Sequence, residues 1–571
     1  MPISFQVTGK NAAALFTLKA YRGEGMALLA MNWKKDTPPD DFVGFAIEYK
    51  TPGGSRFYPL KNRLCFAEAD GDVNPNRLST RLSPIQKFRW IHFPYDAEIP
   101  GKYTYRVTPV FMNAQDELSY GEFQDVEIEL RAETYPKKLN VTFTRGFVSS
   151  QAFVDRYQST GDIATLLPAK AAEGLIFKPT HKKTVDALKW MGFEAREAIL
   201  DVLDEAIADT KAVVRVIAYD LNEPGIVTRL EQLGPRLQVI IDDEGDHGEV
   251  TSGETQAEAR LKASAGTANV KRQHMGKLQH NKSIVVDGPK VKAVVCGSTN
   301  FSWRGFFVQS NNAIVLRGAK PVKAFMAAFD AYWANDGASD FGKTASAQLV
   351  TIGLSGIDAH VGFSPYSAQN ALLAKIADDI AMKTTSSLFY SLAFLSQTPG
   401  VILDAIDKIT NDKSKFVYGI ADKKVGGIQL QKPDGNVAPV YSAQLTKNLP
   451  EPFRSEPVGG GGTRMHHKFV VIDFNKPSAR VYLGSYNFSI AADRQNGENL
   501  LLIRDRRVAT SYMVEALRIF DHYHFRVAQN EAKSTRTKLT LAKPPRKPGE
   551  VPWWKEHYTS VRKIRDREMF A

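Results

Sequence analysis

Cysteine is almost absent from this chain of 571 residues, in which only Cys65 and Cys296 occur, each within an apolar stretch. Two cysteines so far apart do not make the disulfide framework on which small secreted domains depend. A chain of this length buries enough apolar surface to fold without such cross-links. We therefore expect two buried, unreactive thiols in a reducing compartment.

Long apolar runs and a leader segment are also missing. No window of about 18 residues is uninterruptedly apolar, which excludes a membrane-spanning helix. The first twenty residues lack the basic start and apolar run of a secretory signal. We expect a cytoplasmic protein, with export by a non-classical route left open. Hydrophobic residues at 43% and charged residues at 24% exclude a disordered chain, and the length predicts about three or four domains.

Positive charge is concentrated at the C-terminus. The chain has a net charge of +12, and residues 532–571 hold eleven basic and four acidic side chains, a net of +7. A basic tail suits nucleic acid or an anionic membrane surface, and a solvated tail is an equal alternative. The tail also carries Trp553, Trp554, Tyr558 and Phe570. Because residues 565–568 alternate in sign, docking back onto the rest of the chain is equally open.

Residues 1–145 read as β-structure. Period-2 runs at 103–110 and 124–130 are separated by turn signals rich in proline and glycine. Short strands at regular spacing predict a small β-sandwich, immunoglobulin-like, with Trp90 or Phe93 in its core. We expect this accessory domain to recognise a partner protein or to act as a structural cover.

From about residue 146 helical and strand patterns alternate, which argues for α/β layers. The series occurs twice, so the fold class we predict is α/β, with two lobes of mixed sheet flanked by helices. We place the first lobe at 146–345, the second at 346–531 and the basic tail at 532–571.

The two lobes repeat the same pair of motifs. HNKSIVVD at 280–287 and GSTNFS at 297–302 are matched by HHKFVVID at 466–473 and GSYNFS at 484–489. The offset is 186 residues in the first motif and 187 in the second. An offset preserved across two separated motifs indicates an internal duplication. Duplicated units usually pack about a pseudo-twofold axis, which would bring the motifs face to face.

The motifs carry residues suited to phosphoryl chemistry. On a strand, residues two apart point the same way, so His280 and Lys282 project together, as do His466 and Lys468. Two ammonium groups and several donors around one point form a pocket for a tetrahedral oxyanion. One imidazole can attack phosphorus while the other protonates the leaving oxygen.

We expect no metal and no cofactor at these motifs, because no thiolates or carboxylates with metal-ligand spacing accompany them. An acidic cluster does follow a predicted strand. Its irregular spacing favours a solvated loop over a metal site. The cluster consists of Asp242, Asp243, Glu244, Asp246 and His247.

HxKxxxxD followed by GSxN, present twice, resembles the phospholipase D superfamily over roughly residues 150–525. The resemblance implies that His280 is the nucleophile, forming a phosphohistidine. His466 would be the general acid and would then activate the water or alcohol that resolves the intermediate. The resemblance assigns structural roles to Asp287 and Asp473. The phosphate-binding residues it implies are Lys282, Lys468, Asn300, Asn487, Ser298 and Ser485.

The two lobes differ downstream of GSxN, where the second has Glu498 and the first has Asn311. Members of the family use this position to hold the distal nitrogen of a catalytic imidazole. Tyrosyl-DNA phosphodiesterases show a similar amide-first, glutamate-second pattern, with the glutamate serving the nucleophile across the interface. We therefore assign Glu498 to His280 and an orienting role to Asn311, while a same-lobe pair of Glu498 with His466 stays open.

Several neighbours of the motifs have weaker signals. His467 points away from His466 along its strand and is expected to pack or support. Gly459 to Gly462 are expected to form a mobile loop at the pocket mouth. Trp303 and Arg304 follow GSTNFS, where they would stack on a base and touch a phosphate, with core packing of the tryptophan an equal alternative.

Nucleic acid is the first substrate we predict, DNA or RNA cleaved by a metal-independent nuclease. The run RMHHKFVVID at 464–473 resembles the nuclease branch, and the charge balance is basic. The alternative is a phospholipase D acting on anionic phospholipid or cardiolipin, because mitochondrial cardiolipin-cleaving relatives carry similar motifs. A binding protein with a decayed pocket is a third reading. Both half-sites lie in one chain, so catalysis requires no oligomer.

Overall fold

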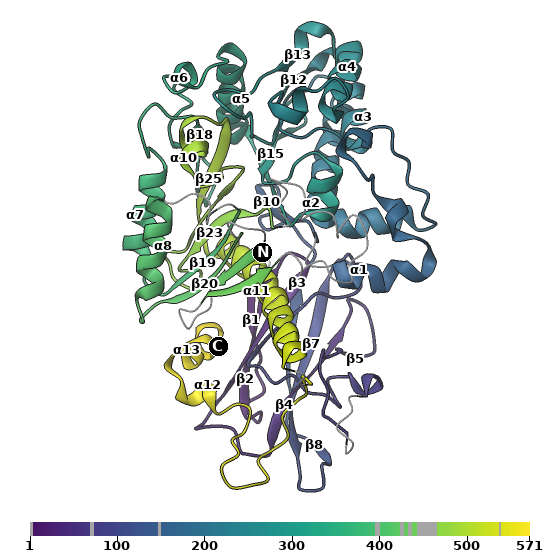
Figure 1. Cartoon of the computed structure of the whole chain (residues 1–571), viewed down its shortest axis with the longest axis vertical. Coiled ribbons are helices and arrows are strands. Elements are labelled where there is room, and N and C mark those ends of the chain that lie inside the picture. Colours follow the sequence, from purple (N-terminus) through teal and green to yellow (C-terminus); the bar gives the residue numbers. More distant parts are fainter. Residues whose placement is uncertain are drawn as a thin grey trace. The chain divides into compact units, whose positions relative to one another are not determined.

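The computed structural model separates the chain into two compact units, residues 1–132 with 513–571 and residues 133–512 (Figure 1). The domain boundaries expected after residues 145 and 531 therefore differ from the unit boundaries of the structure, which lie after residues 132 and 512. The structure describes residues 4–68, 74–146, 150–393, 395, 400–422, 427–431, 437–441, 465–535 and 538–571.

The first unit contains two antiparallel sheets, as the sequence predicted. One has the order β1 (Gln6–Thr8), β2 (Phe16–Gly23), β3 (Met26–Trp33) and β6 (Arg89–His92). The other has the order β5 (Tyr58–Pro59), β4 (Phe42–Lys50), β7 (Lys102–Met112) and β8 (Leu118–Tyr120), with β9 (Gln124–Glu129) also paired to β7.

The core of this unit is formed by alternate residues of its strands. Phe16 and Leu18 of β2 and Tyr103 and Tyr105 of β7 are completely buried in one apolar cluster. This alternation is the period-2 pattern of strands that bury one face. Trp90, expected at the centre, is only partly buried and packs against the cluster.

The C-terminal segment is part of the first unit. It comprises the end of α11 (Arg506–Ser534), then α12 (Glu556–Thr559) and α13 (Val561–Phe570). Trp554 lies in the sandwich core and its indole N–H donates to the Pro39 carbonyl at 3.2 Å. Trp553 donates to the Phe42 carbonyl at 3.0 Å, and Phe570 is completely buried. The aromatic side chains of the tail thus pack against the β-domain, which leaves little of them to contact a nucleic acid or a bilayer.

The first lobe of the second unit is a seven-stranded mixed sheet. Its order is β10 (Leu139–Phe143), β16 (Asn312–Arg317), β15 (Lys292–Gly297), β14 (Ser283–Asp287), β11 (Val213–Ala218), β12 (Leu237–Ile241) and β13 (Val270–Arg272). Its helices are α1 (Ser150–Tyr157), α2 (Thr184–Ala208), α3 (Pro224–Leu233), α4 (Gly253–Ala265) and α5 (Ala319–Ala334). Strand β10 had been assigned to the N-terminal domain, but it pairs with β16 and belongs to this sheet.

The second lobe is a nine-stranded sheet. Its order is β17 (Val350–Thr351), β18 (Asp358–Ser364), β25 (Glu498–Arg504), β24 (Arg480–Gly484), β23 (Lys468–Ile472), β19 (Ser387–Leu392), β20 (Phe416–Asp422), β21 (Gly427–Gln431) and β22 (Val437–Tyr441). Its helices are α6 (Ala338–Phe341), α7 (Leu373–Lys383), α8 (Val401–Asn411) and α10 (Ile490–Arg494).

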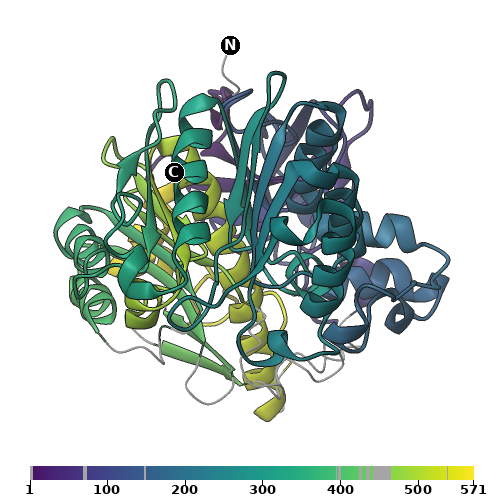
Figure 2. The same ribbon diagram turned by 90° about the horizontal axis from the view of Figure 1, so that it is seen from above.

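The two sheets share one topology. The order β10-β16-β15-β14-β11-β12 is repeated by β18-β25-β24-β23-β19-β20, with the same parallel and antiparallel pairs. The repeat ends there, because β13 adds parallel to β12 whereas β21 adds antiparallel to β20. Figure 2 shows the strands of the two lobes in neighbouring layers. Duplication at the level of the motifs therefore extends to six strands per lobe.

Two further sequence expectations can be compared with the structure. Cys65 and Cys296 are both buried free thiols, as expected. Among the described helices, none combines the length and apolar character needed to cross a bilayer.

Candidate active site

The two motif histidines face each other between the lobes of the second unit. His280 precedes β14 and His466 precedes β23, and their ring centroids lie 6.3 Å apart at an interplanar angle of 70°. Their exposed fractions are only 4% and 5%. The structure therefore brings together, in one chain, the two imidazoles that the duplicated motifs place far apart in sequence.

Each imidazole is held by a side chain of the opposite lobe. Both carboxylate oxygens of Glu498, at the start of β25, lie 2.9 Å from His280 Nδ1. Asn311, just before β16, places Oδ1 2.8 Å from His466 Nδ1. Of the two alternatives left open for Glu498, the structure has the cross-lobe pair. With Nδ1 committed to these acceptors, Nε2 is the nitrogen left for chemistry on each ring.

A second pair of hydrogen bonds also joins side chains of one lobe to side chains of the other. Asn499 Nδ2 donates to Asn281 Oδ1 at 2.6 Å, and Asn312 Nδ2 lies 3.4 Å from His467 Nδ1. His467 is completely buried and its ring faces Phe143 and Phe469. It thus packs and supports, as its outward direction from His466 predicts. These contacts fix the register of one lobe against the other.

The Gly-Ser pairs of the motifs allow the strands that carry these side chains to approach. Gly297 and Gly484 have φ of 140° and 150°, and a Cβ on either would lie within 2.5 Å of a carbonyl oxygen of the next strand. Ser298 Oγ donates to Asn311 Oδ1 at 2.9 Å, and the Ser485 hydroxyl hydrogen-bonds Glu498. The two buried hydroxyls thus support the side chains that orient the histidines, and the phosphate contact expected of both serines stays a prediction.

Both motif lysines are buried against the backbone of their own histidines. Lys282 Nζ donates to the His280 carbonyl at 2.5 Å, and Lys468 Nζ donates to the His466 carbonyl at 2.9 Å. Burial lowers the pKa of Lys282 to about 8, and the charge of Glu498 opposes this shift. The centre therefore concentrates positive charge where a phosphoryl group would sit.

The motif asparagines flank the same region. Asn300 is buried, Asn487 is half-buried, and Oδ1 of each is buried without a hydrogen-bond partner among the described residues. Since an amide oxygen only accepts, a contact of these two carboxamides with phosphoryl oxygens would have to come from their Nδ2 groups.

The electrostatics favour neutral imidazoles before a substrate binds. Burial and the nearby ammonium groups of Lys282 and Lys468 lower the pKa of both His280 and His466 well below 6.5. Burial raises the pKa of Glu498 to about 8, with the charge of Lys282 opposing it. Glu498 and His280 are in hydrogen-bond contact and therefore titrate as one coupled pair.

The two motif aspartates have different surroundings. Asp473 is completely buried and accepts hydrogen bonds from the backbone N–H groups of Thr385, Ser386 and Ser387, at 3.0, 2.7 and 3.1 Å. Asp287 is 38% exposed and forms an ion pair with Lys292 across a hairpin. Asp473 therefore holds a strand end through buried hydrogen bonds, whereas Asp287 joins the ends of β14 and β15 through a partly exposed ion pair.

Of the two residues after GSTNFS, Trp303 lies in the core and Arg304 lies near the site. Trp303 is buried and its indole N–H donates to the Gly174 carbonyl at 2.9 Å, so it packs in the core and does not offer a stacking face. Arg304 is exposed, and its charge helps to lower the pKa of His466, which places it near the site. Gly459 to Gly462 lie outside the described residues.

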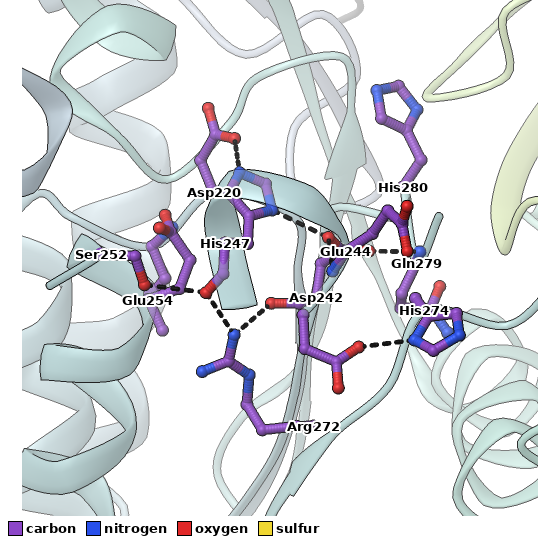
Figure 3. Close-up of polar contacts among 12 residues, drawn as sticks. Asp220, Asp242, Glu244, His247, Ser252, Glu254, Arg272, His274, Gln279 and His280 are labelled. Atoms are coloured by element: carbon purple, nitrogen blue, oxygen red, sulfur yellow. Dashed lines mark hydrogen bonds and ion pairs between the residues drawn. The ribbon is translucent and has the colours of Figure 1, made fainter. Parts of the chain in front are cut away.

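A second cluster of polar residues lies beside His280 (Figure 3). Asp220, His247 and Glu254 offer ligand atoms that all lie within 4.8 Å of one another, a set that could hold a metal ion. The solvated loop predicted for 242–247 is wrong for Asp242, which is completely buried and contacts His247. Sequence reasoning missed Asp220 and Glu254 because they lie outside that run, on segments that only the fold brings together.

Comparisons with known proteins agree with the duplicated fold. The family described as "Cardiolipin synthase, PLD-like domain" matches residues 203–333 and 409–520, which include both pairs of motifs. The phospholipase D of Rickettsia prowazekii is 46% identical over 48 residues, which are 8% of this chain and 22% of that protein. The match thus spans about a fifth of the relative's length.

Two solved structures are similar to parts of the chain. Phosphatidylserine synthase of Haemophilus influenzae aligns with a TM-score of 0.40 and 13% identity, covering 59% of this chain and 91% of that one. Nuc of Salmonella typhimurium, a phospholipase D family member, aligns with a TM-score of 0.20 and 24% identity, covering 24% of this chain and 87% of that one.

Proposed function

The chain belongs to the phospholipase D superfamily, and from this premise we propose that it is a phosphodiesterase that works through a covalent phosphohistidine. The observation that carries the proposal is the pair of imidazoles, 6.3 Å apart, each fixed through Nδ1 by the opposite lobe. A phosphorus atom between them would meet Nε2 of one ring and present its leaving oxygen to the other.

In the first step His280 is the nucleophile. Its Nδ1–H donates to Glu498, so the lone pair on Nε2 attacks phosphorus as the bond from phosphorus to the leaving oxygen breaks. Glu498 stabilises the positive charge that develops on the ring, as the carboxylate of a catalytic triad does. Lys282 and Lys468 balance the negative charge on the phosphoryl oxygens.

His466 supplies the proton that the leaving oxygen takes. The Asn311 amide is fixed because its Nδ2 donates to the Gly305 carbonyl at 2.9 Å, so its oxygen faces His466 Nδ1. His466 Nδ1 therefore carries a hydrogen, and the acid form needs a second proton on Nε2. A bound phosphodiester anion favours that imidazolium, because it offsets the neighbouring ammonium charges. After the proton leaves, neutral His466 activates the water that cleaves the phosphohistidine.

Nucleic acid is the substrate class we propose first. The exposed guanidinium of Arg304 near His466 adds a third cation to the two motif lysines, which suits a polyanionic backbone. Phospholipid is the second candidate, and the description of the matching family favours it. The packed positions of Trp303 and of the tail aromatics remove two arguments that the sequence alone offered for nucleic acid.

A side-by-side assay tests both parts of the proposal. The purified chain is incubated with single-stranded DNA, duplex plasmid, RNA and anionic phospholipid vesicles, with the His280→Asn variant as the blank. We expect turnover of nucleic acid that the variant lacks. Turnover of lipid alone would show that the second candidate, phospholipid, is the substrate class. If none of the four, nor the activated diester bis(p-nitrophenyl) phosphate, is cleaved, the proposed function is wrong.

A further inference from the structure

The polar cluster beside His280 contacts the catalytic segments of the first lobe at two points. At its centre is His247, in the short helical turn Gly245–Gly248. Its Nδ1 lies 2.8 Å from Asp242 Oδ1 and its Nε2 lies 3.2 Å from Asp220 Oδ1, so the ring bridges two carboxylates (Figure 3). The exposed fraction of the imidazole is 16%, and that of Asp242 is zero. The bridge is thus largely withdrawn from solvent.

One end of the bridge holds the segment that leads into His280. The second carboxylate oxygen of Asp242 accepts a hydrogen bond from the backbone N–H of Gln279 at 2.6 Å. Gln279 directly precedes His280, so the position of Asp242 sets where the chain enters the motif. A charge-assisted hydrogen bond to a buried carboxylate is among the stronger restraints available to a backbone group.

The other end holds the segment that follows GSTN. Ser302 Oγ donates to the second oxygen of Asp220 at 3.1 Å and accepts from the Gly305 N–H at 3.1 Å. The Gly305 carbonyl in turn accepts from Asn311, the side chain that orients His466. Asp220 is therefore linked through two hydrogen-bonded residues to the orienting group of the second histidine.

The charge balance of the cluster fits a protonated imidazole. Its two ring nitrogens face carboxylate oxygens of Asp242 and Asp220, at 2.8 and 3.2 Å, and an ionised carboxylate only accepts hydrogen bonds. Both ring nitrogens then donate, and the imidazolium itself is the counter-ion of the carboxylates. Glu254 is engaged separately, with Oε1 accepting from the Leu221 N–H at 2.9 Å.

The cluster also acts on the charge of Lys282. The ammonium lies 4.5 Å from the centroid of the Tyr219 ring, which in turn packs between His247 and His280 at 4.5 and 4.7 Å. Burial lowers the pKa of Lys282, and nearby carboxylates oppose that shift. The titratable and charged groups around Lys282 are Glu498, Asp220, Asp242, Tyr219, His280, His466 and, through the two aspartates, His247.

Within the part of the chain that the structure describes, this arrangement occurs in the first lobe. Ile217 pairs with Ser283 and Ser391 pairs with Phe469, and those two partners occupy the same motif position. Two residues further along, Tyr219 therefore corresponds to Ala393, and in the sequence Asp220 corresponds to Phe394. At these two positions the sequence of the second lobe lacks the polar side chains of the cluster, which accompanies the histidine proposed as the nucleophile.

We propose that Asp220, His247 and Asp242 form a positioning relay for the nucleophile's half-site. The relay holds the segment before His280 against the segment after Asn300 through hydrogen bonds. Its charges also set the electrostatic field at the Lys282 ammonium group. These residues are positioning residues, because none of them contacts the reacting atoms. The inference rests on the proposed function, and its test is designed to fail separately from that proposal.

The test compares Asp220→Asn, His247→Gln and the double variant in the cleavage of bis(p-nitrophenyl) phosphate. We expect each single variant to lower kcat by about 10- to 100-fold, the range that misplacement of a reacting group produces. Because the residues act as one unit, the double variant should be about as slow as either single variant.

The pH profile distinguishes a relay from a general loss of structure. Asp220→Asn removes a negative charge near Lys282, so the alkaline limb of kcat/KM should move to lower pH. His247→Gln removes a positive charge, so the same limb should move to higher pH. Shifts of opposite sign are not expected from variants that only loosen the fold.

The matched control is His274→Gln. His274 Nδ1 lies 2.9 Å from Asp243 Oδ1, but this pair is exposed and outside the relay, so the variant should behave like wild type. If Asp220→Asn or His247→Gln unfolds below the assay temperature, Ser302→Ala replaces it. This variant removes one hydrogen bond of the relay and should lower kcat by less than the factor of about 10 to 100 expected above.

Wild-type kinetics in the relay variants, or additive losses of kcat with an unmoved alkaline limb, would overturn the proposal. So would a stoichiometric Zn²⁺ or Mn²⁺ at Asp220, His247 and Glu254 that the rate requires. A wild-type protein that cleaves no diester overturns the proposed function instead.

Discussion

Glu498 and His280 come from different lobes, yet both carboxylate oxygens lie 2.9 Å from the same ring nitrogen. The matching pair, Asn311 and His466, has a neutral amide in place of the carboxylate. The duplication therefore supplies two similar half-sites with different charges. Only the imidazole beside the carboxylate gains stabilisation of a positive charge, which distinguishes a nucleophile from a proton donor.

Glu498→Gln should lower kcat by about 10²- to 10⁴-fold, the scale seen when the carboxylate beside a catalytic imidazole becomes an amide. The amide fits the same space but does not stabilise a cationic ring. The measurement is steady-state cleavage of bis(p-nitrophenyl) phosphate, with circular dichroism as the control for folding. A variant within a few-fold of wild type would show that Glu498 has no part in the reaction.

Asn311→Asp should shift the pH dependence of the proton donor. A negative charge beside His466 Nδ1 raises the pKa of that imidazole, which burial and the two lysines otherwise hold low. The limb of kcat that reports loss of the acidic proton should therefore move to higher pH. An unchanged kcat profile in a folded variant would remove His466 from the role of acid.

Lys282 sets an alkaline limit to activity. Its pKa is lowered to about 8, so kcat/KM should fall as pH rises through that value and the ammonium loses its proton. Lys282→Arg keeps a positive charge to far higher pH, because a guanidinium does not deprotonate in proteins. We expect a slower enzyme whose alkaline limb is absent. A limb that persists unchanged in this variant would belong to another group.

The two motif aspartates should differ in their effect on stability. Asp473→Asn should lower the free energy of unfolding by about 2 kcal/mol, since a buried acceptor of several hydrogen bonds is lost. Asp287→Asn removes a partly exposed ion pair and should cost less than about 1 kcal/mol. Denaturant unfolding at pH 7 measures both. Equal losses would show that the motif aspartates have the same role.

The stability contributed by Asp473 should also depend on pH. Burial opposes its charge, but hydrogen bonds from Thr385 and the backbone of Ser386 and Ser387 lower its pKa. A carboxyl with a depressed folded pKa stabilises the protein above the unfolded value of about 3.9, and the stability is lost as pH falls through the folded value. The difference between wild type and Asp473→Asn should thus shrink below about pH 4. A constant difference down to pH 3 would contradict this origin.

The duplicated lobes and their motifs could be predicted because the periodicity of β14 and β23 is local and the offset between repeats is visible in the sequence. The partner of Glu498 could not be chosen, because the repeat alone does not say whether a strand reaches its own histidine or that of the other lobe. Ser298 was assigned to phosphate for a similar reason. Its residue type suits a phosphate, and only the fold shows that Asn311 takes its hydroxyl.

Other features depended on long-range packing. Trp554 and Phe570 are typical both of a bilayer-binding tail and of a segment that fills a core, and the structure places them in the first unit. The relay around His247 joins Asp220, Asp242 and the segment before His280, which come from separate stretches of the chain. Charge patterning within the run 242–247 indicated solvent, because a buried carboxylate is recognised only when its donors are known.

Trapping the covalent intermediate tests the central claim most directly. His466→Asn removes the group that activates water while leaving His280 and Glu498 in place. With ³²P-labelled bis(p-nitrophenyl) phosphate, whose leaving group departs without a proton from His466, a single turnover should leave acid-labile label on the protein. Mass spectrometry of the quenched protein should locate the phosphoryl group on His280. Label on His466 in the complementary His280→Asn variant, with no label on His280 in the His466→Asn variant, would reverse the assigned roles. The absence of any covalent phosphohistidine, in a wild-type protein that does cleave the diester, would contradict the account.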